Sequence, residues 1–412
     1  PLLTAWDEET LAAAALRCEP VTFLLTNSRS LSEADAVAVN RDVGFALARA
    51  ATAEGKRLRL ISRSDSTLRG HFPAEVDALV EGAGIAPDGI VICPAFFEAG
   101  RFTADGIHWV HSNGQLLPAC QTEFAADATF GFNELALADW ARTRGAPSDV
   151  IDIGLGELSR MDVDAVGEKL GAAAGGQAIV VNATNYQHLE VFFAAARDAE
   201  EKGKVLVYRT GPSFVRAAAG LGVPALADLG PQDDELGPGL VVAGSHTELT
   251  NAQVASACQI HELVEVQLDA SATLDAERAD DQIAQTAAVA VEALSRGSVL
   301  LRTSRGVITH DETRTPLEIS RTVSAALTAV VRQIVASASI DWVVAKGGIT
   351  SHDLLVSAFG VRTAEVLGQA LPGIIPVLEI SVAGQRLPFV IFPGNVGDEM
   401  TMSRVLDRLV GP

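Results

Sequence analysis

The sequence contains few aromatic residues, few cysteines and no long apolar segment. Aromatic residues make up 5% of the 412 positions, and Ala, Val, Leu and Gly supply most of the apolar content. This mixture suits helices packed on a parallel sheet better than a β-sandwich. The four cysteines form no CxxC pair, which argues against a disulfide framework or a zinc site and favours buried thiols in a reducing cytoplasm. Because no apolar run reaches about 18 residues, we expect no membrane-spanning helix.

Basic charge is also scarce: 31 Lys and Arg residues face 52 Asp and Glu residues, which gives a formal charge of −21. A surface of this sign repels nucleic acid and anionic membranes, so neither is an expected partner. A small anionic metabolite remains compatible with this charge, because arginines and helix N-termini act locally, over a few ångströms.

Several common motifs are missing as well. The chain has no GxxxxGK[ST] phosphate loop, no GxGxxG fingerprint, no HExxH and no GxSxG, which argues against a standard P-loop enzyme. Its eight histidines show no metal-ligand spacing, so no residue is assigned as a metal ligand. His71, His108 and His111 lie near candidate sites, and we expect them to support the structure or other site residues.

The order of apolar and amphipathic segments predicts two domains. In the first two hundred residues, short apolar runs alternate with helical patterns such as 33–53 and 187–202, a rhythm typical of parallel strands with helices on both faces. The acidic, turn-rich stretch 224–238 breaks this pattern. We therefore predict two α/β domains, residues 1–235 and 236–412, each with a largely parallel sheet flanked by helices. A ligand cleft is expected between them, closing about the linker. The expected strands are 21–26, 58–62, 89–93, 178–181, 204–208, 240–243, 298–301 and 342–345, with a hairpin across 374–391.

A polar run follows an expected strand in the first half. Residues 62–71 (SRSDSTLRGH) combine arginines, hydroxyl side chains and Asp65 at a strand end, where α/β proteins bind ligands. Arginine suits a carboxylate or phosphate, and Asp65 could hold or deprotonate a hydroxyl. The alternative is an ordinary strand-to-helix turn, in which Asp65 and Ser66 only cap the helix and the arginines are solvated.

Two further arginines follow expected strands. Arg29 lies in the run 27–30, where capping explains the serines but not the arginine. Arg101 lies in the run 93–103, after the third strand, in a position typical of a functional loop. Both are candidates for ligand contacts.

Three glycine-bearing junctions in the second half each join an expected strand to a helix. They are 243–250 (AGSHTELT), 346–353 (KGGITSHD) and 393–398 (PGNVGD). Glycine lets a ligand approach the backbone, and the unpaired amides of a helix N-terminus favour phosphate. One such junction could be a simple tight turn, but three in one domain indicate phosphate binding. Lys346 could place a positive charge on a phosphate; the alternative is an exposed lysine at a strand end.

These runs resemble the four-carbon acid sugar kinase family, long catalogued as a domain of unknown function, over essentially the whole chain. DSTLRG at 65–70 is the most specific mark, and TNSRS at 26–30, GS at 244–245, GGIT at 347–350 and PGNVG at 393–397 fall in the expected order. The resemblance implies a kinase of carbohydrate metabolism that uses ATP. Its N-terminal domain would bind an acid similar to threonate, erythronate or a 3-oxo derivative, and its C-terminal domain ATP. The residues implied on the substrate side are Arg29, Asp65, Ser66, Thr67 and Arg69, with Arg101 as a further candidate, and on the nucleotide side Ser245, Gly347, Gly348, Thr350, Gly394, Asn395 and Gly397.

The beginning of the sequence departs from that family. Members usually start with a strand that ends in paired aspartates followed by Thr-Gly, and this sequence starts after that point. Without that strand a sheet edge would need a cover, for example from a neighbouring chain, so a homodimer is one expected assembly.

The resulting hypothesis is a kinase in which arginines fix the substrate carboxylate. Asp65, or an aspartate of the missing segment, would orient or deprotonate the hydroxyl, while glycine amides, Lys346 and Mg²⁺ would neutralise the γ-phosphate. Two alternatives stay open: a non-catalytic nucleotide or sugar-acid sensor, and an ATP-independent isomerase or aldolase.

Overall fold

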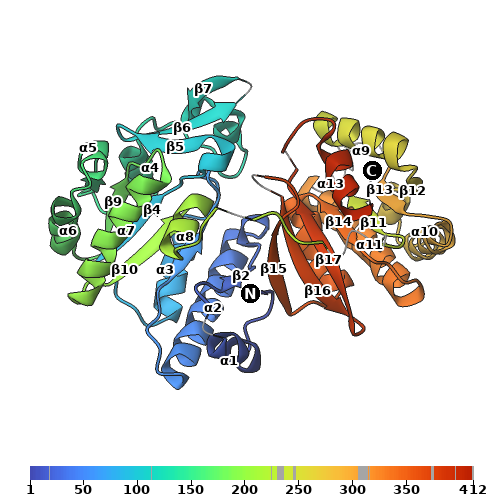
Figure 1. Ribbon diagram of the computed structural model, residues 1–412, viewed down its shortest axis with the longest axis horizontal. Coiled ribbons are helices and arrows are strands. Elements are labelled where there is room, and N and C mark those ends of the chain that lie inside the picture. Colours follow the sequence, from blue (N-terminus) through green and yellow to red (C-terminus); the bar gives the residue numbers. More distant parts are fainter. Residues whose placement is uncertain are drawn as a thin grey trace. The chain divides into compact units, whose positions relative to one another are not determined.

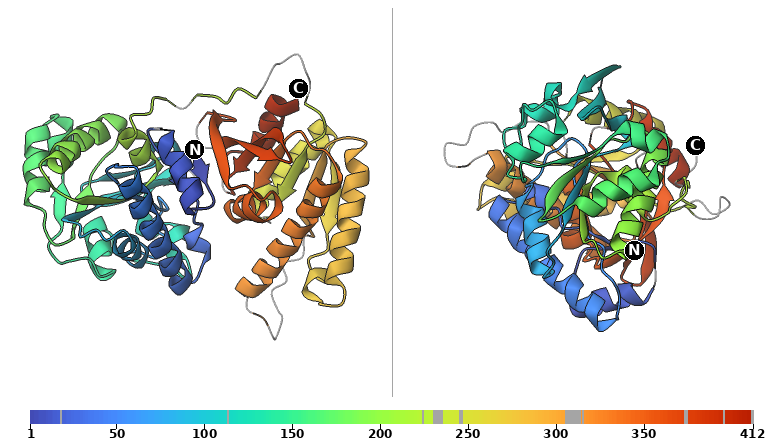
Figure 2. Two further views of the ribbon diagram at one scale, coloured as in Figure 1. Left: turned by 90° about the horizontal axis from the view of Figure 1, so that it is seen from below. Right: turned by 90° about the vertical axis from the view of Figure 1, so that its left-hand side faces the viewer.

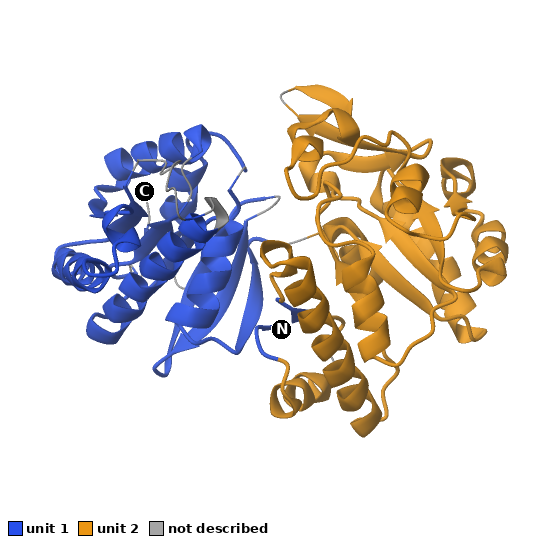
Figure 3. Cartoon of the chain, turned by 180° about the vertical axis from the view of Figure 1, so that it is seen from behind, with its two compact units in different colours: residues 1–5, 23–25, 224–412 blue, residues 6–22, 26–223 orange. Residues whose placement is uncertain are grey.

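The protein forms two compact units, coloured separately in Figure 3. The computed structural model describes residues 1–17, 19–112, 114–223, 225–229, 236–244, 247–304, 314, 316–372, 375–394 and 396–410. The N-terminal unit contains Trp6–Thr22 and Thr26–Val223, and the C-terminal unit contains Pro1–Ala5, Phe23–Leu25 and Pro224–Pro412. The predicted boundary at residue 235 lies outside the described residues, and the ligand cleft stays a prediction. The predicted two-domain α/β class is confirmed.

The N-terminal unit is built on a parallel sheet with helices on its faces (Figure 1). In spatial order its strands are β3 (Ile61–Arg63), β10 (Leu206–Thr210), β4 (Gly89–Cys93), β9 (Gln177–Val181) and β8 (Ile151–Ile153). The central strands read as continuous apolar runs because both of their faces are covered. The helices are α1 (Glu8–Leu16), α2 (Glu33–Ala53), α3 (Ala74–Gly82), α4 (Leu137–Thr143), α5 (Leu155–Ser159), α6 (Val163–Ala172), α7 (Tyr186–Glu201) and α8 (Pro212–Ala218).

Helices α2 and α3 approach each other closely through glycine. A Cβ atom at Gly44 of α2 would lie 2.2 Å from the carbonyl oxygen of Leu79, and one at Gly82 of α3 would lie 2.0 Å from that of Arg41. This contact fixes the helix that follows Arg29 against the helix that follows the 62–71 run.

A small antiparallel sheet that the sequence did not predict sits after β4. It consists of β5 (Arg101–Ala104), β6 (Ile107–Ser112) and β7 (Gln115–Pro118). Asp105 and Gly106, which join β5 to β6, have φ values of 52° and 74°. This is the geometry that makes Asp-Gly a favoured two-residue hairpin turn. The hairpin places Arg101 on a regular strand rather than on an open loop.

The C-terminal unit contains a mixed nine-stranded sheet. Its parallel part is β12 (Val264–Leu268), β13 (Val299–Thr303), β11 (Leu240–Ala243), β14 (Val343–Lys346) and β17 (Gln385–Phe392), followed by the antiparallel strands β16 (Pro376–Val382) and β15 (Thr363–Gln369). One face packs against α10 (Ala279–Leu294) and α11 (Pro316–Ser337), which run side by side in Figures 1 and 2. The other face packs against α9 (Glu248–His261) and α13 (Thr401–Val410). In the described part of the chain, no helix combines the length and the hydropathy needed to cross a bilayer.

The beginning of the chain completes this second sheet. Strand β1 (Leu2–Leu3) pairs antiparallel with β15, and β2 (Phe23–Leu24) pairs parallel with β1 at the edge. The segment 21–26 was predicted as a strand of the first half. Instead its residues Phe23–Leu24 join the sheet of the C-terminal unit by pairing with β1, which in turn pairs with the distant strand β15.

Candidate active site

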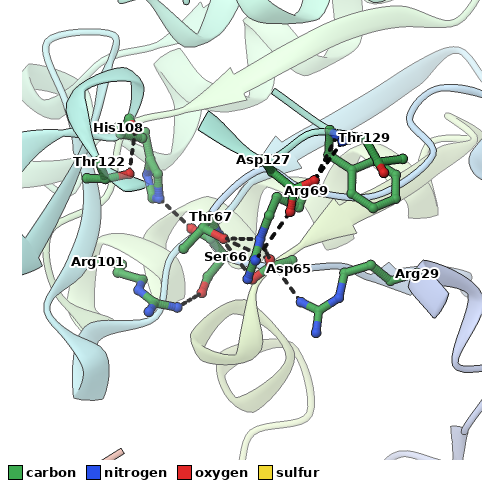
Figure 4. A network of polar contacts seen from close by, with 12 residues as sticks. Arg29, Asp65, Ser66, Thr67, Arg69, Arg101, His108, Thr122, Asp127 and Thr129 are labelled. Carbon is green, nitrogen blue, oxygen red and sulfur yellow. Dashed lines mark hydrogen bonds and ion pairs between the residues drawn. The ribbon is translucent and has the colours of Figure 1, made fainter. Parts of the chain in front are cut away.

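Asp65 is the centre of a polar network at the carboxyl end of β3 (Figure 4). Its Oδ2 accepts hydrogen bonds from Arg29 Nη1 at 3.0 Å, Thr67 Oγ1 at 2.7 Å and Arg69 Nε at 2.8 Å. Its Oδ1 accepts from the backbone amide of Thr67 at 3.2 Å. Asp65 therefore does more than cap a helix, since its carboxylate binds two guanidinium groups.

The environment of Asp65 keeps it ionised. Burial on its own would raise the pKa of Asp65, but the charges of Arg29 and Arg69 and the hydrogen bonds of Thr67 and Arg69 outweigh burial and lower the pKa to about 2. A carboxylate with so low a pKa is a weak proton acceptor. The geometry thus favours Asp65 as the residue that orients the two arginines.

The Ser66 side of the loop is held by strands β5 and β6. Arg101 Nη1 donates to Ser66 Oγ at 2.7 Å. His108, which is buried, lies 2.8 Å from the Ser66 carbonyl through Nε2 and 3.0 Å from Thr103 Oγ1 through Nδ1. Since a carbonyl only accepts, Nε2 carries the hydrogen and Nδ1 accepts from the threonine. The expectation that His108 supports other site residues agrees with this geometry.

Two residues that the sequence did not indicate complete the network. The guanidinium carbons of Arg69 and Arg101 lie 5.0 and 5.3 Å from the centre of the Phe124 ring, within the range of a cation–π contact. Arg69 Nη1 also lies 3.7 Å from Asp127 Oδ2. Arg29 remains half exposed and Arg69 a quarter exposed, so both can present N–H donors to a bound anion.

The burial of His108 predicts that the free energy of unfolding falls in acid. Burial lowers the pKa of His108 to about 4, although the hydrogen bond to Ser66 opposes this shift. An unfolded histidine accepts a proton near pH 6.5, so the unfolded chain binds more protons as the pH falls from about 6.5 to 4. We expect this to remove up to about 3 kcal/mol from the free energy of unfolding.

Urea unfolding at pH 7 and pH 4.5 measures this effect. His108→Gln should lose most of the pH dependence, whereas His111→Gln, which changes an exposed side chain, should keep it. The same slope in His108→Gln as in the wild type would assign the sensitivity to another group.

In the C-terminal unit, the three glycine junctions follow neighbouring strands. Strand β14 lies between β11 and β17, with Lys346 opposite Ala243 and Phe392. A Cβ atom at Gly244 would lie 2.6 Å from Thr350 Oγ1, and one at Gly347 would lie 3.3 Å from it. The junctions therefore meet at one edge of the sheet.

The remaining predicted nucleotide-side residues are placed as follows. Gly348 begins the short helix α12 (Gly348–Asp353), and Gly394 and Gly397 lie in the turn before α13. Ser245 and Asn395 lie outside the described residues.

Lys346 is buried, whereas the alternative interpretation was an exposed lysine at a strand end. It has 0% solvent exposure, and its Nζ donates to the carbonyls of Pro393 and Gly394 at 2.9 and 3.1 Å. The ammonium also lies 4.1 Å from the centre of the Phe392 ring. Lys346 thus ties the β14 junction to the β17 junction.

Comparisons with known proteins also find two domains in the chain. Residues 3–218 match the family model described as a sugar-binding N-terminal domain, and residues 240–402 match that of a nucleotide-binding C-terminal domain. The D-erythronate kinase of Heliobacterium modesticaldum is 26% identical, over 84% of this chain and 79% of its own. The D-threonate kinase of Salmonella typhimurium is 27% identical, over 83% and 78%. A solved structure from Haemophilus influenzae has the same fold, with a TM-score of 0.64 and 19% identity over 94% of this chain and 90% of that one.

Fold and sequence together define a two-domain α/β protein that combines a sugar-binding domain with a nucleotide-binding domain. The chain belongs to the four-carbon acid sugar kinase family, as the resemblance of its motifs predicted.

Proposed function

We propose that this protein is an ATP-dependent kinase that phosphorylates the terminal hydroxyl of a four-carbon acid sugar, such as a tetronate or 3-oxo-tetronate. The observation that carries the proposal is the arginine network on Asp65, in the unit that matches a sugar-binding domain. A sugar acid differs from a neutral sugar by its carboxylate, and guanidinium groups bind carboxylates with defined geometry.

On the substrate side, Arg29, Arg69 and Arg101 are the proposed carboxylate ligands. Asp65 Oδ2 orients Arg29 and Arg69, and Ser66 orients Arg101. Held by its carboxylate, the substrate would present its terminal hydroxyl in a fixed orientation, and positioning is the main requirement of phosphoryl transfer. Ser66 and Thr67 are proposed to bind the hydroxyl groups of the acid.

On the nucleotide side, the glycine junctions of β11, β14 and β17 are proposed to bind the phosphates of ATP. Backbone amides that glycine leaves uncovered are suited to this task, and Lys346 adds positive charge beside the β17 turn. Gly347, Gly348, Thr350, Gly394 and Gly397, together with Ser245 and Asn395, are the proposed contacts.

Mg²⁺ is proposed to arrive with the nucleotide. Among the described residues, no group of three or more His, Cys, Asp and Glu side chains is arranged to hold a metal ion. Magnesium in kinases is commonly held through substrate phosphates and water with only one or two carboxylates. Bound there, it would neutralise phosphate charge.

ADP release with a panel of acids tests the proposal. We expect turnover with at least one of D-threonate, D-erythronate or their 3-oxo derivatives in the presence of ATP and Mg²⁺. Threitol and erythritol, which keep the hydroxyls but lack the carboxylate, should give little turnover, because the arginines have no anion to bind. Equal rates with an acid and its matching alcohol would reject the arginines as carboxylate ligands.

A thermal-shift measurement with ATP and Mg²⁺, an assay of acid conversion without ATP and the ADP assay together separate the two alternatives. A sensor would be stabilised against heat by ATP but would release no ADP, and an isomerase or aldolase would convert the acid without ATP. The named relatives, both kinases, favour neither alternative.

A further inference from the structure

Gln253 holds the turn 393–398 from inside the C-terminal unit. It lies on α9 without solvent exposure, and its Nε2 donates to the carbonyls of Val396 and Asp398 at 2.9 and 2.8 Å. Lys346 holds the first part of the same turn through two further carbonyls. Two buried side chains from different elements therefore bind four carbonyl groups of one short turn.

The direction of these carbonyls determines the direction of the amides. In a trans peptide, the C=O group and the N–H group of the next residue point in opposite directions. Because the carbonyls of Pro393 and Val396 are directed at buried donors, the amides of Gly394 and Gly397 are directed away from them. Backbone amides that point away from buried partners in this way are available to bind an anion.

Glycine keeps these amides uncovered. A Cβ atom at Gly394 would meet no described heavy atom within 4 Å, so packing does not require glycine there. Gly397 has φ = 79°, and a Cβ atom on it would lie 2.2 Å from Thr401 Oγ1, so the bend itself requires glycine.

Gln253 also carries a cost that the fold by itself does not explain. Its Oε1 is buried and has no hydrogen-bond partner among the described residues, which is unfavourable. A methionine would fill the same volume without a buried polar oxygen, but it could not bind the two carbonyls. The amide of Gln253 is therefore suited to holding the turn rather than to stabilising the core.

We infer that Gln253 is a positioning residue of the nucleotide site: together with Lys346 it fixes the turn 393–398 so that the amides of Gly394 and Gly397 donate to a phosphate group of ATP. This inference rests on the proposed kinase function. Gln253 acts through the turn and does not itself contact the nucleotide.

Gln253→Met tests the inference by steady-state kinetics with ATP and the acid sugar varied separately. The KM for ATP should rise about tenfold, because the turn loses two hydrogen bonds and its amides lose their fixed direction. The KM for the acid sugar should stay within about twofold. The shift in melting temperature caused by ATP with Mg²⁺ should shrink in parallel, while that caused by the acid should not.

Thr286→Val is the matched control. Thr286 is buried on α10, which packs against the other face of the sheet, and its hydroxyl donates to the Gln282 carbonyl at 2.7 Å. The Thr286→Val variant also loses a buried hydrogen bond and should be less stable than the wild type, but its KM for ATP should not change. An equal rise of the KM in Thr286→Val would attribute the effect in Gln253→Met to general loosening of the unit.

The outcomes separate this inference from the function on which it rests. A wild type that releases no ADP with any acid refutes the kinase proposal. An active wild type with an unchanged KM for ATP in Gln253→Met refutes the positioning role alone. Gln253→Glu, which keeps the length and a polar end but has no amide hydrogens, replaces Gln253→Met if the latter does not fold. If neither variant folds, Gln253 is a determinant of the fold and the positioning role is rejected.

Discussion

Asp65→Asn is expected to lower kcat/KM for the acid sugar by about a thousandfold, because it disorders two arginines at once. Oδ2 of Asp65 binds Arg29, Thr67 and Arg69 within 3.0 Å. Asparagine has the same size, but it carries no charge and has only one acceptor oxygen. The two guanidiniums would lose the counter-ion that directs them, and the substrate carboxylate would meet mobile donors.

The same substitution should lower the free energy of unfolding at pH 7 by about 2 kcal/mol. In the folded protein the pKa of Asp65 is about 2, below its ordinary value of 3.8. The stabilisation from a lowered carboxyl pKa is present above the unfolded value and is lost as the pH falls through the folded value. The difference between wild type and Asp65→Asn should therefore disappear between about pH 4 and pH 2.

Asp139→Asn provides the control for both measurements. Asp139 pairs with Arg142 at 2.6 Å on the exposed side of α4, and exposed pairs contribute little to stability. Neither kcat/KM nor stability should change in this variant. If Asp65→Asn kept kcat/KM within about threefold of the wild type, the orienting role of Asp65 would be wrong.

The sequence predicted best those parts of the fold whose signal is local. Strands β4 and β11 were predicted with their observed bounds, because a strand buried on both faces reads as a short apolar run between turn residues. β2 was assigned to the first half, although it lies in the other unit's sheet. It joins that sheet through β1, which pairs with a strand more than three hundred residues away along the chain (Leu2 pairs with Ala364), and local periodicity does not encode such a pairing.

The difference between local and distant contacts also explains which residues of the candidate site the sequence indicated and which it did not. Asp65, Thr67 and Arg69 lie in one run, so the sequence marked them together as candidates, although an ordinary strand-to-helix turn remained the alternative. Phe124 joins that network from a segment without a motif. Gln253 reaches its turn across 143 residues of sequence, and in its own helix it looks like any polar residue. Side chains that act by holding a distant backbone leave no local pattern.

Lys346→Met is expected to lower kcat/KM for ATP at pH 7 by about a hundredfold. Methionine fills the buried volume, so the fold should survive, but the variant loses a positive charge and both hydrogen bonds to the β17 turn. The KM for the acid sugar should change much less, because the arginine network belongs to the other unit.

The pH dependence of the wild type separates the charge of Lys346 from its hydrogen bonds. Burial lowers the pKa of Lys346 to about 8, so the ammonium loses its charge as the pH rises through that value. A neutral amine still has hydrogens to donate to two carbonyls, which keeps the turn in place while the charge is lost. We therefore expect the KM for ATP to rise above about pH 8 in the wild type and to stay flat in Lys346→Met.

A loss of folding stability would not explain a rise in the KM for ATP above about pH 8. With a folded pKa below the ordinary 10.5, Lys346 makes the unfolded chain bind more protons between about pH 8 and 10.5, so its contribution to stability increases with pH in that window. Lys202→Met, which removes an exposed lysine paired with Asp198, should keep the wild-type profile. If Lys346→Met also kept the wild-type pH profile, another group would titrate near pH 8. Lys346 would then act on ATP only through the turn that it holds.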